Sequence, residues 1–214
     1  MTGIAITGGE GPKSAALKKL AKLADLIVAA DSGLEACEEA DIAPDWIVGD
    51  MDSLDDLKRL EKYPPERVVR YPGDKDFSDT ELALSLLWEK GCGELWLAGG
   101  GGGRTDHLLA IRSLFERQKA PDRWFTAGEE IFRLIDGQTR CVEGAIGGVV
   151  SVFPLGVGPW QAESTGLKWP LNGVVWENGG LSLSNIAQDA PFEIKSKKGD
   201  FLVIMETANG GNNY

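Results

Sequence analysis

Short runs of β-branched and aliphatic residues alternate with amphipathic segments up to about residue 126. This alternation predicts a mostly parallel sheet with covering helices, an α/β fold. One of the expected helices opens with Ser78-x-x-Glu81, the pattern of a capping box. The expected strands are Gly3–Thr7, Leu26–Ala30, Trp46–Val48, Arg67–Tyr71, Glu94–Ala98 and Arg123–Thr126, and the expected helices are Ser14–Ala24, Leu54–Tyr63, Asp79–Lys90 and Asp106–Arg117.

The pattern changes after Asp136, where short apolar runs are broken by Gly, Pro and Asn and no convincing helix follows. This pattern predicts a small antiparallel β domain, either a sandwich or a barrel. We therefore expect an α/β domain over residues 1–136 and an all-β domain over residues 137–214. The strands expected in the second domain are Gly148–Phe153, Gly173–Trp176, Leu181–Leu183, Phe192–Lys195 and Phe201–Glu206.

The amino-acid composition narrows the classes of protein that fit. The chain has 214 residues, 43% of them apolar, which is enough for one large or two small domains. Its net charge of −11 argues against nucleic acid as a partner, because nucleic-acid binders display a basic face. If the ligand is a polyphosphate, metal ions are expected to bridge the like charges.

Neither a membrane segment nor a cysteine-based site is expected. No apolar run approaches the roughly 20 residues of a membrane helix, and the N-terminus lacks the features of a signal peptide. We therefore expect a cytoplasmic protein with no membrane partner. Cys37, Cys92 and Cys141 are scattered and do not cluster with the single histidine, His107, which argues against a zinc site or a disulfide framework.

Acidic residues directly follow several of the expected strands. Ligands of an open parallel sheet bind beyond the carboxyl ends of its strands, so these residues are the first candidates for a site. Each could alone be a turn former or a helix cap, but all of them fall at the same edge of the sheet. The segments are Asp31-Ser32-Gly33, Asp50-Met51-Asp52-Ser53, the run from Gly73 to Asp79, and Arg104-Thr105-Asp106 after five glycines.

Two of these segments point to metal and phosphate. The pair Asp50-x-Asp52 can direct two carboxylates at one centre, and hard oxygen ligands suit Mg²⁺. The run Gly99–Gly103 lets the backbone approach a polyphosphate, and Arg104 offers a fork suited to phosphate oxygens. The glycines could instead form a flexible strand-to-helix turn. Their match to a dinucleotide fingerprint is weak, and the sequence contains no G-x-x-x-x-G-K-[ST] motif.

Other catalytic chemistries find little support in the sequence. No G-x-S-x-G elbow is present, and His107 is interpreted as a helix-start residue beside Asp106 rather than as a catalyst. Carboxylates, a metal and an arginine suffice for phosphoryl transfer, in which positioning and charge neutralisation supply most of the catalysis. The sequence therefore predicts a Mg²⁺-dependent site for transferring phosphoryl groups from a nucleotide.

Several specific motifs occur in a fixed order along the chain. In the N-terminal part they are Asp31-Ser32-Gly33, Pro44–Leu54 with its GDMDSL ending, DKDFSDTE at Asp74–Glu81, and Gly102–His107. In the C-terminal part they are GLKWPL at Gly166–Leu171 and the pair Ser184-Asn185. Together they resemble the signatures of the thiamine pyrophosphokinase family over most of the chain. Met51 and the stretch Leu183-Ser184-Asn185-Ile186 depart from the residues usual in that family.

The resemblance implies a fold and a reaction. The expected fold is a Rossmann-like α/β domain followed by a β-sandwich that binds thiamine and mediates dimerisation, in a homodimer whose active sites form between subunits. The expected reaction transfers the pyrophosphoryl group of ATP to the hydroxyl of thiamine, giving thiamine diphosphate and AMP with the help of Mg²⁺.

The resemblance also implies roles for individual residues. The implied Mg²⁺ ligands are Asp50, Asp52 and Asp79. The implied catalytic residues are Asp31, Asp52, Asp79 and Asp106. The residues implied around the nucleotide are Lys75, Asp76, Gly101, Gly102, Gly103 and Arg104. The residues implied on the thiamine side are Trp169, Ser184 and Asn185, with packing in the sandwich core as the alternative for Trp169.

Two other functions are weighed against this one. A pyrophosphokinase for another heterocyclic alcohol, such as a hydroxymethylpterin, would keep the aspartates and change the pocket of the second domain, whereas the GLKWPL and SN motifs favour thiamine. A non-catalytic nucleotide-binding module on the same fold would be expected to lack Asp50, Asp52 or Asp79, and all three are present.

Overall fold

The structure is a computed structural model, and it describes residues 1–51, 57–72, 74 and 76–207. Two of the predicted site residues, Asp52 and Lys75, lie outside the described residues. The chain divides into two compact units, the first spanning Met1–Ala127 and the second beginning at Gly128. None of the described helices combines the length and the apolar composition that a membrane-spanning helix needs.

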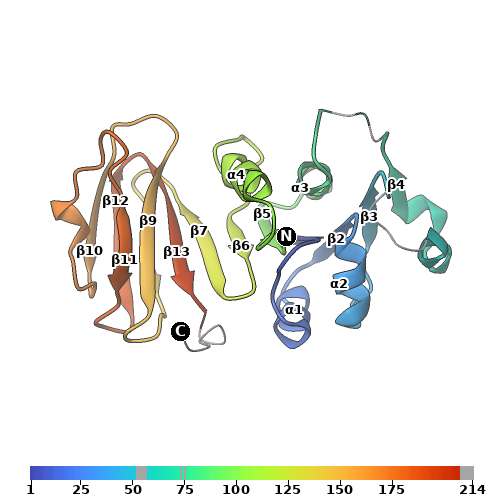
Figure 1. The fold of residues 1–214 in the computed structure, drawn as a ribbon, viewed down its shortest axis with the longest axis horizontal. Coiled ribbons are helices and arrows are strands. Elements are labelled where there is room, and N and C mark those ends of the chain that lie inside the picture. Colours follow the sequence, from blue (N-terminus) through green and yellow to red (C-terminus); the bar gives the residue numbers. More distant parts are fainter. Residues whose placement is uncertain (52–56, 73, 75, 208–214) are drawn as a thin grey trace. The chain divides into compact units, whose positions relative to one another are not determined.

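The first unit is built on a sheet in which the strands run in the order β6-β5-β1-β2-β3-β4. Every neighbouring pair in this series is parallel, which confirms the predicted parallel sheet (Figure 1). Parallel strands need a crossover connection, and helices supply most of these. The strands are β1 Thr2–Thr7, β2 Leu26–Ala30, β3 Trp46–Gly49, β4 Val68–Arg70, β5 Glu94–Ala98 and β6 Arg123–Phe125.

Helices cover both faces of this sheet. Ile4 and Ile6 of β1 face one side and pack with Leu17 of α1 and Leu34 of α2 in one buried cluster. Helices α3 and α4 lie on the other face (Figure 1). The central strands are therefore buried on both sides, and this explains their continuous apolar runs. The helices are α1 Ser14–Ala21, α2 Gly33–Glu39, α3 Asp79–Glu89 and α4 Thr105–Leu114, with 3₁₀ helices at Leu57–Lys62 and Pro65–Arg67.

Aspartates at the amino edge of the sheet have a structural role. The backbone N–H of Ile27 donates to Oδ2 of Asp45 at 2.9 Å, and the N–H of Asp45 donates back to the Ile27 carbonyl at 2.8 Å. Asp25 makes the same reciprocal pair with Thr2, and Asp122 makes it with Leu95. Each aspartate thus satisfies an amide at the start of a neighbouring strand. Asp45 belongs to one of the family motifs, yet it lies at the edge opposite the candidate site.

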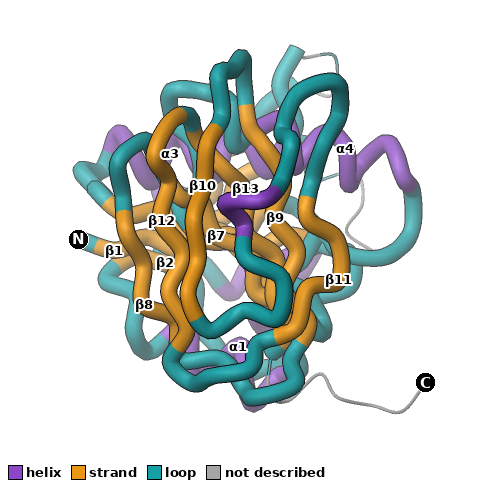
Figure 2. The backbone as a smooth tube through the Cα atoms, turned by 90° about the vertical axis from the view of Figure 1, so that its left-hand side faces the viewer, coloured by secondary structure: helices purple, strands orange, loops and turns teal. Residues whose placement is uncertain are grey.

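The second unit is a sandwich of two antiparallel sheets, as the resemblance implied and as Figure 2 shows for the front sheet. One sheet has the order β11-β9-β13-β7 and the other β10-β12-β8. Phe132, Val152 and Phe201 from the first sheet and Phe192 and Ile194 from the second share one buried core. The strands are β7 Glu129–Leu134, β8 Thr139–Val142, β9 Val149–Leu155, β10 Gln161–Thr165, β11 Ser182–Ile186, β12 Phe192–Lys198 and β13 Asp200–Glu206.

Some expected elements differ from the structure. The run Gly173–Trp176 was expected to be a strand, but a 3₁₀ helix covers Leu171–Gly173 and the chain after it is irregular. Its apolar residue Trp176 is buried through an edge-on contact with Phe201, with ring centroids 4.9 Å apart, rather than through strand pairing. The described part of the helix expected at Leu54–Tyr63 is the 3₁₀ helix Leu57–Lys62. Helix α2 and strands β7, β8 and β10 were not predicted.

Candidate active site

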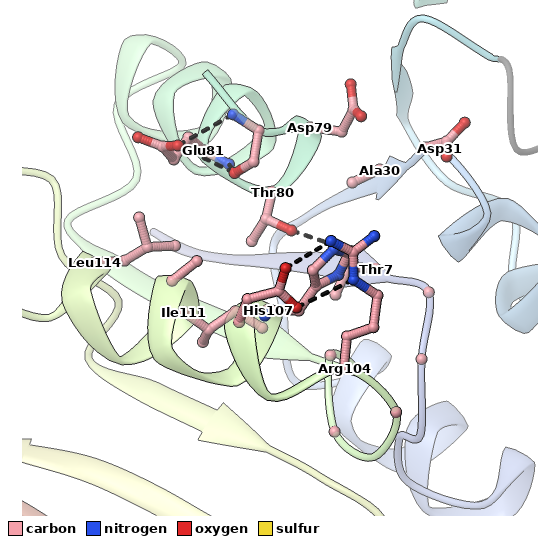
Figure 3. Close-up of a pocket in the computed structure, with 18 of the residues that line it drawn as sticks. Thr7, Ala30, Asp31, Asp79, Thr80, Glu81, Arg104, His107, Ile111 and Leu114 are labelled. Atoms are coloured by element: carbon pink, nitrogen blue, oxygen red, sulfur yellow. Dashed lines mark hydrogen bonds and ion pairs between the residues drawn. The ribbon is translucent and has the colours of Figure 1, made fainter. Parts of the chain in front are cut away.

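A cavity of about 860 Å³ lies at the carboxyl edge of the sheet in the first unit. The ends of β1 and β2, the start of α3, the glycine loop after β5 and one side of α4 line it (Figure 3). This is the edge at which the sequence placed the polar residues. The cavity therefore gathers side chains from segments that are far apart in the chain.

Three aspartates form an acidic cluster beside this cavity, and we call Asp31, Asp50 and Asp79 the carboxylate cluster. Each contributes a carboxylate oxygen, and these oxygens all lie within 4.8 Å of one another. Asp31 follows β2, Asp50 follows β3, and Asp79 is the first residue of α3. Asp50 and Asp79 were predicted as metal ligands, whereas Asp31 was expected only as a catalytic residue of the site.

The backbone around the carboxylate cluster is shaped to bring the three side chains together. Asp31 has a φ of 47°, a left-handed conformation that Asp tolerates better than most residues, and its N–H donates to the Val48 carbonyl at 2.8 Å. Gly49 has a φ of 148°, and a Cβ atom there would lie 3.2 Å from both the Asp31 Cβ and an oxygen of Asp79. Glycine at this position therefore leaves room for the cluster to close.

The electrostatics of the cluster favour a cation. Asp31 is only 8% exposed, and within the described residues its Oδ1 has no hydrogen-bond partner. A buried carboxylate next to two others is costly unless positive charge compensates it. Oxygen ligands of this kind suit a hard divalent cation such as Mg²⁺. The residues present thus fit a bound metal on both geometry and charge.

The start of α3 is held by the predicted capping box, which is present in the structure. The N–H of Glu81 donates to the Ser78 Oγ at 3.3 Å, and Oε2 of Glu81 accepts from the Ser78 N–H at 3.0 Å. The other oxygen of Glu81 forms an ion pair with Arg117, which follows α4. Because Asp79 directly follows the cap residue Ser78 and begins the first turn, these contacts fix its position at the rim of the cavity.

The glycine loop packs against the loop that follows β1. The N–H of Gly100 donates to the Gly8 carbonyl at 2.7 Å, and Glu10 and Gly101 exchange two backbone hydrogen bonds of 2.7 and 2.9 Å. A Cβ atom on Gly99 would lie 2.2 Å from the Thr7 carbonyl oxygen, whereas one on Gly103 would meet nothing within 4 Å. The first glycines are therefore needed for packing, whereas the last one, Gly103, has open space beside its backbone.

The loop after β1 was missed by the sequence analysis. Gly8, Gly9 and Glu10 line the cavity together with the glycine loop. The signal was present, because GGEG directly follows the first strand at the same edge as the aspartates. Strand-end position alone would have added this segment to the site.

Arg104 and Asp106 form a charge pair at the mouth of the cavity. Nε and Nη2 of Arg104 donate to Oδ1 and Oδ2 of Asp106 at 3.1 and 2.5 Å. The hydrogen bond and the charge of Arg104 hold the pKa of the Asp106 carboxyl below its usual value. Thr7 and Thr80, which also line the cavity, have hydroxyl oxygens 3.1 Å apart (Figure 3). The pair presents a guanidinium group to whatever occupies the cavity.

Two family models match this chain, and they match it in the order of its two units. The model described as "Thiamin pyrophosphokinase, catalytic domain" matches residues 17–123. The model described as "Thiamin pyrophosphokinase, vitamin B1 binding domain" matches residues 140–199. The chain belongs to the thiamine pyrophosphokinase family. It is an enzyme that transfers the pyrophosphoryl group of ATP to thiamine, the reaction of this family.

Individual thiamine pyrophosphokinases are similar over nearly the whole chain. The curated thiamine pyrophosphokinase of Bacillus subtilis is 29% identical over 196 residues, which cover 85% of this chain and 87% of the relative. A crystal structure of the enzyme from the same organism has a TM-score of 0.80 at 25% identity and covers 97% of this chain and 100% of its own. The fold also resembles thiamin pyrophosphokinase from Candida albicans, with a TM-score of 0.75, 19% identity and coverage of 96% and 89%.

The remaining predicted residues of this thiamine pyrophosphokinase lie in different surroundings. Asp106 and His107 are in the first turn of α4, and Asp106 is not part of the carboxylate cluster. Asp76 is exposed and does not line the cavity. In the second unit, Trp169 is 53% exposed and is not a core residue, whereas Asn185 is 1% exposed. Ser184 is exposed at the surface.

Proposed function

We propose that the carboxylate cluster holds the Mg²⁺ on which this thiamine pyrophosphokinase depends. The observation that carries the proposal is the buried Oδ1 of Asp31, which lacks a hydrogen-bond partner among the described residues. The same side chain places a carboxylate oxygen within 4.8 Å of oxygens of Asp50 and Asp79. Bound there, a divalent cation supplies charge neutralisation for the phosphates. Asp52, which follows two residues after Asp50, stays part of the proposed ligand set from the sequence.

The polyphosphate of ATP is proposed to lie between the carboxylate cluster and the glycine loop. The open backbone around Gly103 supports this position, as does the guanidinium group of Arg104 at the mouth of the same cavity. Guanidinium groups match the geometry of phosphate oxygens and remain charged at all physiological pH values. Asp106 then orients Arg104 toward the phosphates. Asp76 and Lys75 remain proposed nucleotide contacts, and Lys75 lies outside the described residues.

The reaction requires in-line attack at the β-phosphorus. A bond forms between the hydroxyl oxygen of thiamine and this phosphorus, and the bond to the oxygen of the departing AMP breaks. The hydroxyl proton passes to a carboxylate at the site, for which Asp79 and Asp52 are the proposed acceptors. Arg104 neutralises charge that accumulates on the flanking phosphates, and the cavity walls hold the reacting groups in line.

The thiamine side of the site is proposed to include Trp169. Its ring is half-exposed, and the Nζ atom of Lys168 lies 4.5 Å from the ring centroid. This contact supports the ability of the ring face to accept a cation. The thiazolium ring of thiamine is cationic and flat, so it can occupy such a face. Ser184, on strand β11, is proposed to contact thiamine as well.

We also propose that the enzyme is a homodimer. Large apolar side chains of the second unit are exposed near Trp169 in the sequence, among them Val175, Leu181 and Leu183. Exposed apolar groups of this kind commonly mark protein interfaces. Measurement of the molar mass in solution by light scattering should give twice the chain mass of 23.0 kDa, and a monomer that retains full activity would contradict this part of the proposal.

A cytoplasmic location is likewise proposed. The thiols of Cys37 and Cys92 are free and buried, as expected of a protein from a reducing compartment. Fractionation of the source cells, with an assay for thiamine diphosphate formation in each fraction, tests this location.

The Mg²⁺ proposal is tested by measuring AMP and thiamine diphosphate formation in the presence of ATP and a panel of alcohols. Activity is expected with thiamine and Mg²⁺, to vanish with excess EDTA, and to return when Mg²⁺ is restored. Undiminished activity in excess EDTA would contradict the proposed metal dependence. A hydroxymethylpterin serves as the competing alcohol, and preference for it over thiamine would contradict the thiamine pocket.

A further inference from the structure

Asn185 is a polar side chain in the core of the sandwich unit, and its amide is fully engaged. Its Oδ1 accepts hydrogen bonds from the N–H of Trp169 at 3.1 Å and from the N–H of Ile186 at 2.9 Å. Its Nδ2 donates to the Trp169 carbonyl at 2.6 Å and lies 3.4 Å from the Oγ of Ser182. At 1% exposure, this side chain has no surface left for a ligand.

The orientation of the Asn185 amide follows from the chemistry of its partners. The two backbone N–H groups can only donate, so they require the carbonyl oxygen of the amide. The Trp169 carbonyl can only accept, so it requires the NH₂ group. The side chain therefore binds both backbone polar groups of one residue, Trp169, as a neighbouring strand would.

An irregularity in β11 turns Asn185 into the core. Successive side chains of a strand point to opposite faces, so Ser182 and Asn185 would normally face opposite ways. The pairing register of β11 with β9 shifts between these two residues, and Ser184 adopts a left-handed φ of 54°. Both Ser182 and Asn185 are consequently buried. Register shifts of this kind commonly re-aim a side chain near a functional site.

The segment that carries Trp169 runs alongside β11 and is attached to it at several points. The N–H of Lys168 donates to the Ile186 carbonyl at 2.8 Å, and Leu167 and Ala187 form an antiparallel bridge. The Asn185 amide extends this attachment by one residue, to Trp169 itself. The backbone of Trp169 is therefore fixed while its ring remains half-exposed.

We infer that Asn185 is a positioning residue that presents the Trp169 ring to thiamine, rather than a residue that contacts thiamine directly as the resemblance implied. The inference rests on the proposed function of Trp169 as the thiamine platform. A buried amide is costly unless all its hydrogen bonds are made, and here two of the four are made to the backbone of the residue that carries the exposed ring. The register shift around Ser184 contributes to this positioning, because it turns the Asn185 side chain into the core.

The test uses the nearly isosteric variant Asn185→Asp in the full-length enzyme. It keeps the oxygen that accepts from the Trp169 N–H but sets a second oxygen against the Trp169 carbonyl, where the donor was. Asn172→Asp, at an exposed position in the 3₁₀ helix of the same unit, adds the same charge and is the matched control. Thermal unfolding of both variants shows whether the fold is kept.

The first measurement follows the ring itself, independently of thiamine. In enzyme labelled with 5-fluorotryptophan, the ¹⁹F signal of Trp169 is assigned by its loss in Trp169→Phe. Asn185→Asp is expected to shift or broaden this signal and to leave the signals of buried Trp96 and Trp124 unchanged, while Asn172→Asp changes none of them. An unaltered Trp169 signal in Asn185→Asp would overturn the inference, whatever the role of Trp169 in binding.

The second measurement separates positioning from direct contact. Asn185→Asp is expected to raise the KM for thiamine about tenfold, the effect of losing one well-placed contact, with little change in the KM for ATP. In a Trp169→Ala background the same substitution should have no further effect on thiamine. An equal effect in both backgrounds would overturn the inference. An unchanged thiamine KM in Trp169→Ala alone would instead contradict the proposed function of Trp169.

Discussion

Asp31 and Asp79 place carboxylate oxygens within 4.8 Å of each other, although one follows strand β2 and the other opens helix α3. Two such groups, joined by Asp50, repel one another unless a cation lies between them. The burial of Asp31 strengthens the argument for a bound metal, because a buried carboxylate needs a compensating positive charge. The carboxylate cluster is therefore the feature on which the account of catalysis depends.

Replacing Asp79 by Asn should lower kcat by about a thousandfold, because a lost metal ligand that contributes several kcal/mol has an effect of this size. Asp31→Asn should behave similarly, and Asn tolerates the left-handed backbone at this position. Steady-state kinetics at saturating Mg²⁺ measure the effect, with circular dichroism to confirm the fold. Near-normal turnover in Asp31→Asn would remove Asp31 from the metal site.

The aspartates at the opposite edge of the sheet should affect stability and not activity. Asp45→Ala removes the acceptor for the Ile27 N–H, so the free energy of unfolding should fall by about 1 kcal/mol while kcat stays unchanged. Asp45→Asn keeps an acceptor oxygen, so its free energy of unfolding should fall by less than that of Asp45→Ala. Urea unfolding and kinetics on the two variants check this. A large loss of kcat in a folded Asp45→Asn variant would show that the two edges are not functionally distinct.

Two glycines of the first unit should differ sharply in their tolerance of alanine. Gly99 has a φ of +101°, and its Cβ would lie 2.2 Å from the Thr7 carbonyl oxygen, whereas a Cβ on Gly93 would meet nothing within 4 Å. Gly99→Ala should therefore lower the free energy of unfolding by about 3 kcal/mol or more, and Gly93→Ala by about 0.5 kcal/mol or less. Equal unfolding midpoints for the two variants in urea would contradict the loop packing described for Gly99.

A pair of facing glutamates predicts a pH dependence of stability in the sandwich unit. Partial desolvation of the carboxylate, together with the charge of Glu206 across the β7–β13 ladder, raises the pKa of Glu129 above its ordinary value of 4.5. The folded state therefore binds this proton more tightly than the unfolded state, and stability falls as the pH rises above about 4.5 through the raised pKa.

Glu206→Gln removes one of the two opposing charges and should flatten this loss of stability between about pH 4.5 and 7. Glu193→Gln, on β12, changes the net charge equally and serves as the control. Unfolding midpoints measured across the pH range give the comparison. The prediction fails if the two variants show the same pH profile as the unmodified chain.

Much of the first unit follows from the sequence because its signals are local. Central strands such as Leu26–Ala30 are continuous apolar runs, and the capping box of Ser78 and Glu81 marks the start of α3 to the residue. Helix α2 was missed because it spans only Gly33–Glu39, too short for a clear helical period. Half-exposed strands of mixed composition, such as Gln161–Thr165, show only a weak alternation of apolar and polar residues, so they were missed as well.

The site was predictable in its location but not in its contacts. The position of Asp50 and Asp79 at the carboxyl edge follows from the order of strands and helices. The inclusion of Asp31 in the cluster depends on its left-handed φ and on the space left by Gly49, which are tertiary features. The engagement of Asn185 with Trp169 depends on a register shift in β11, which no spacing in the sequence encodes.

Metal binding by the carboxylate cluster is measured by titrating the enzyme with Mn²⁺, a spectroscopic substitute for Mg²⁺. The free ion is quantified by its electron paramagnetic resonance signal. The unmodified chain and the matched control Asp45→Asn should bind Mn²⁺ with the same affinity. Asp31→Asn, which changes the net charge equally, should weaken binding by about tenfold or more. Equal Mn²⁺ affinity in Asp31→Asn and the unmodified chain would contradict a metal held by Asp31, Asp50 and Asp79.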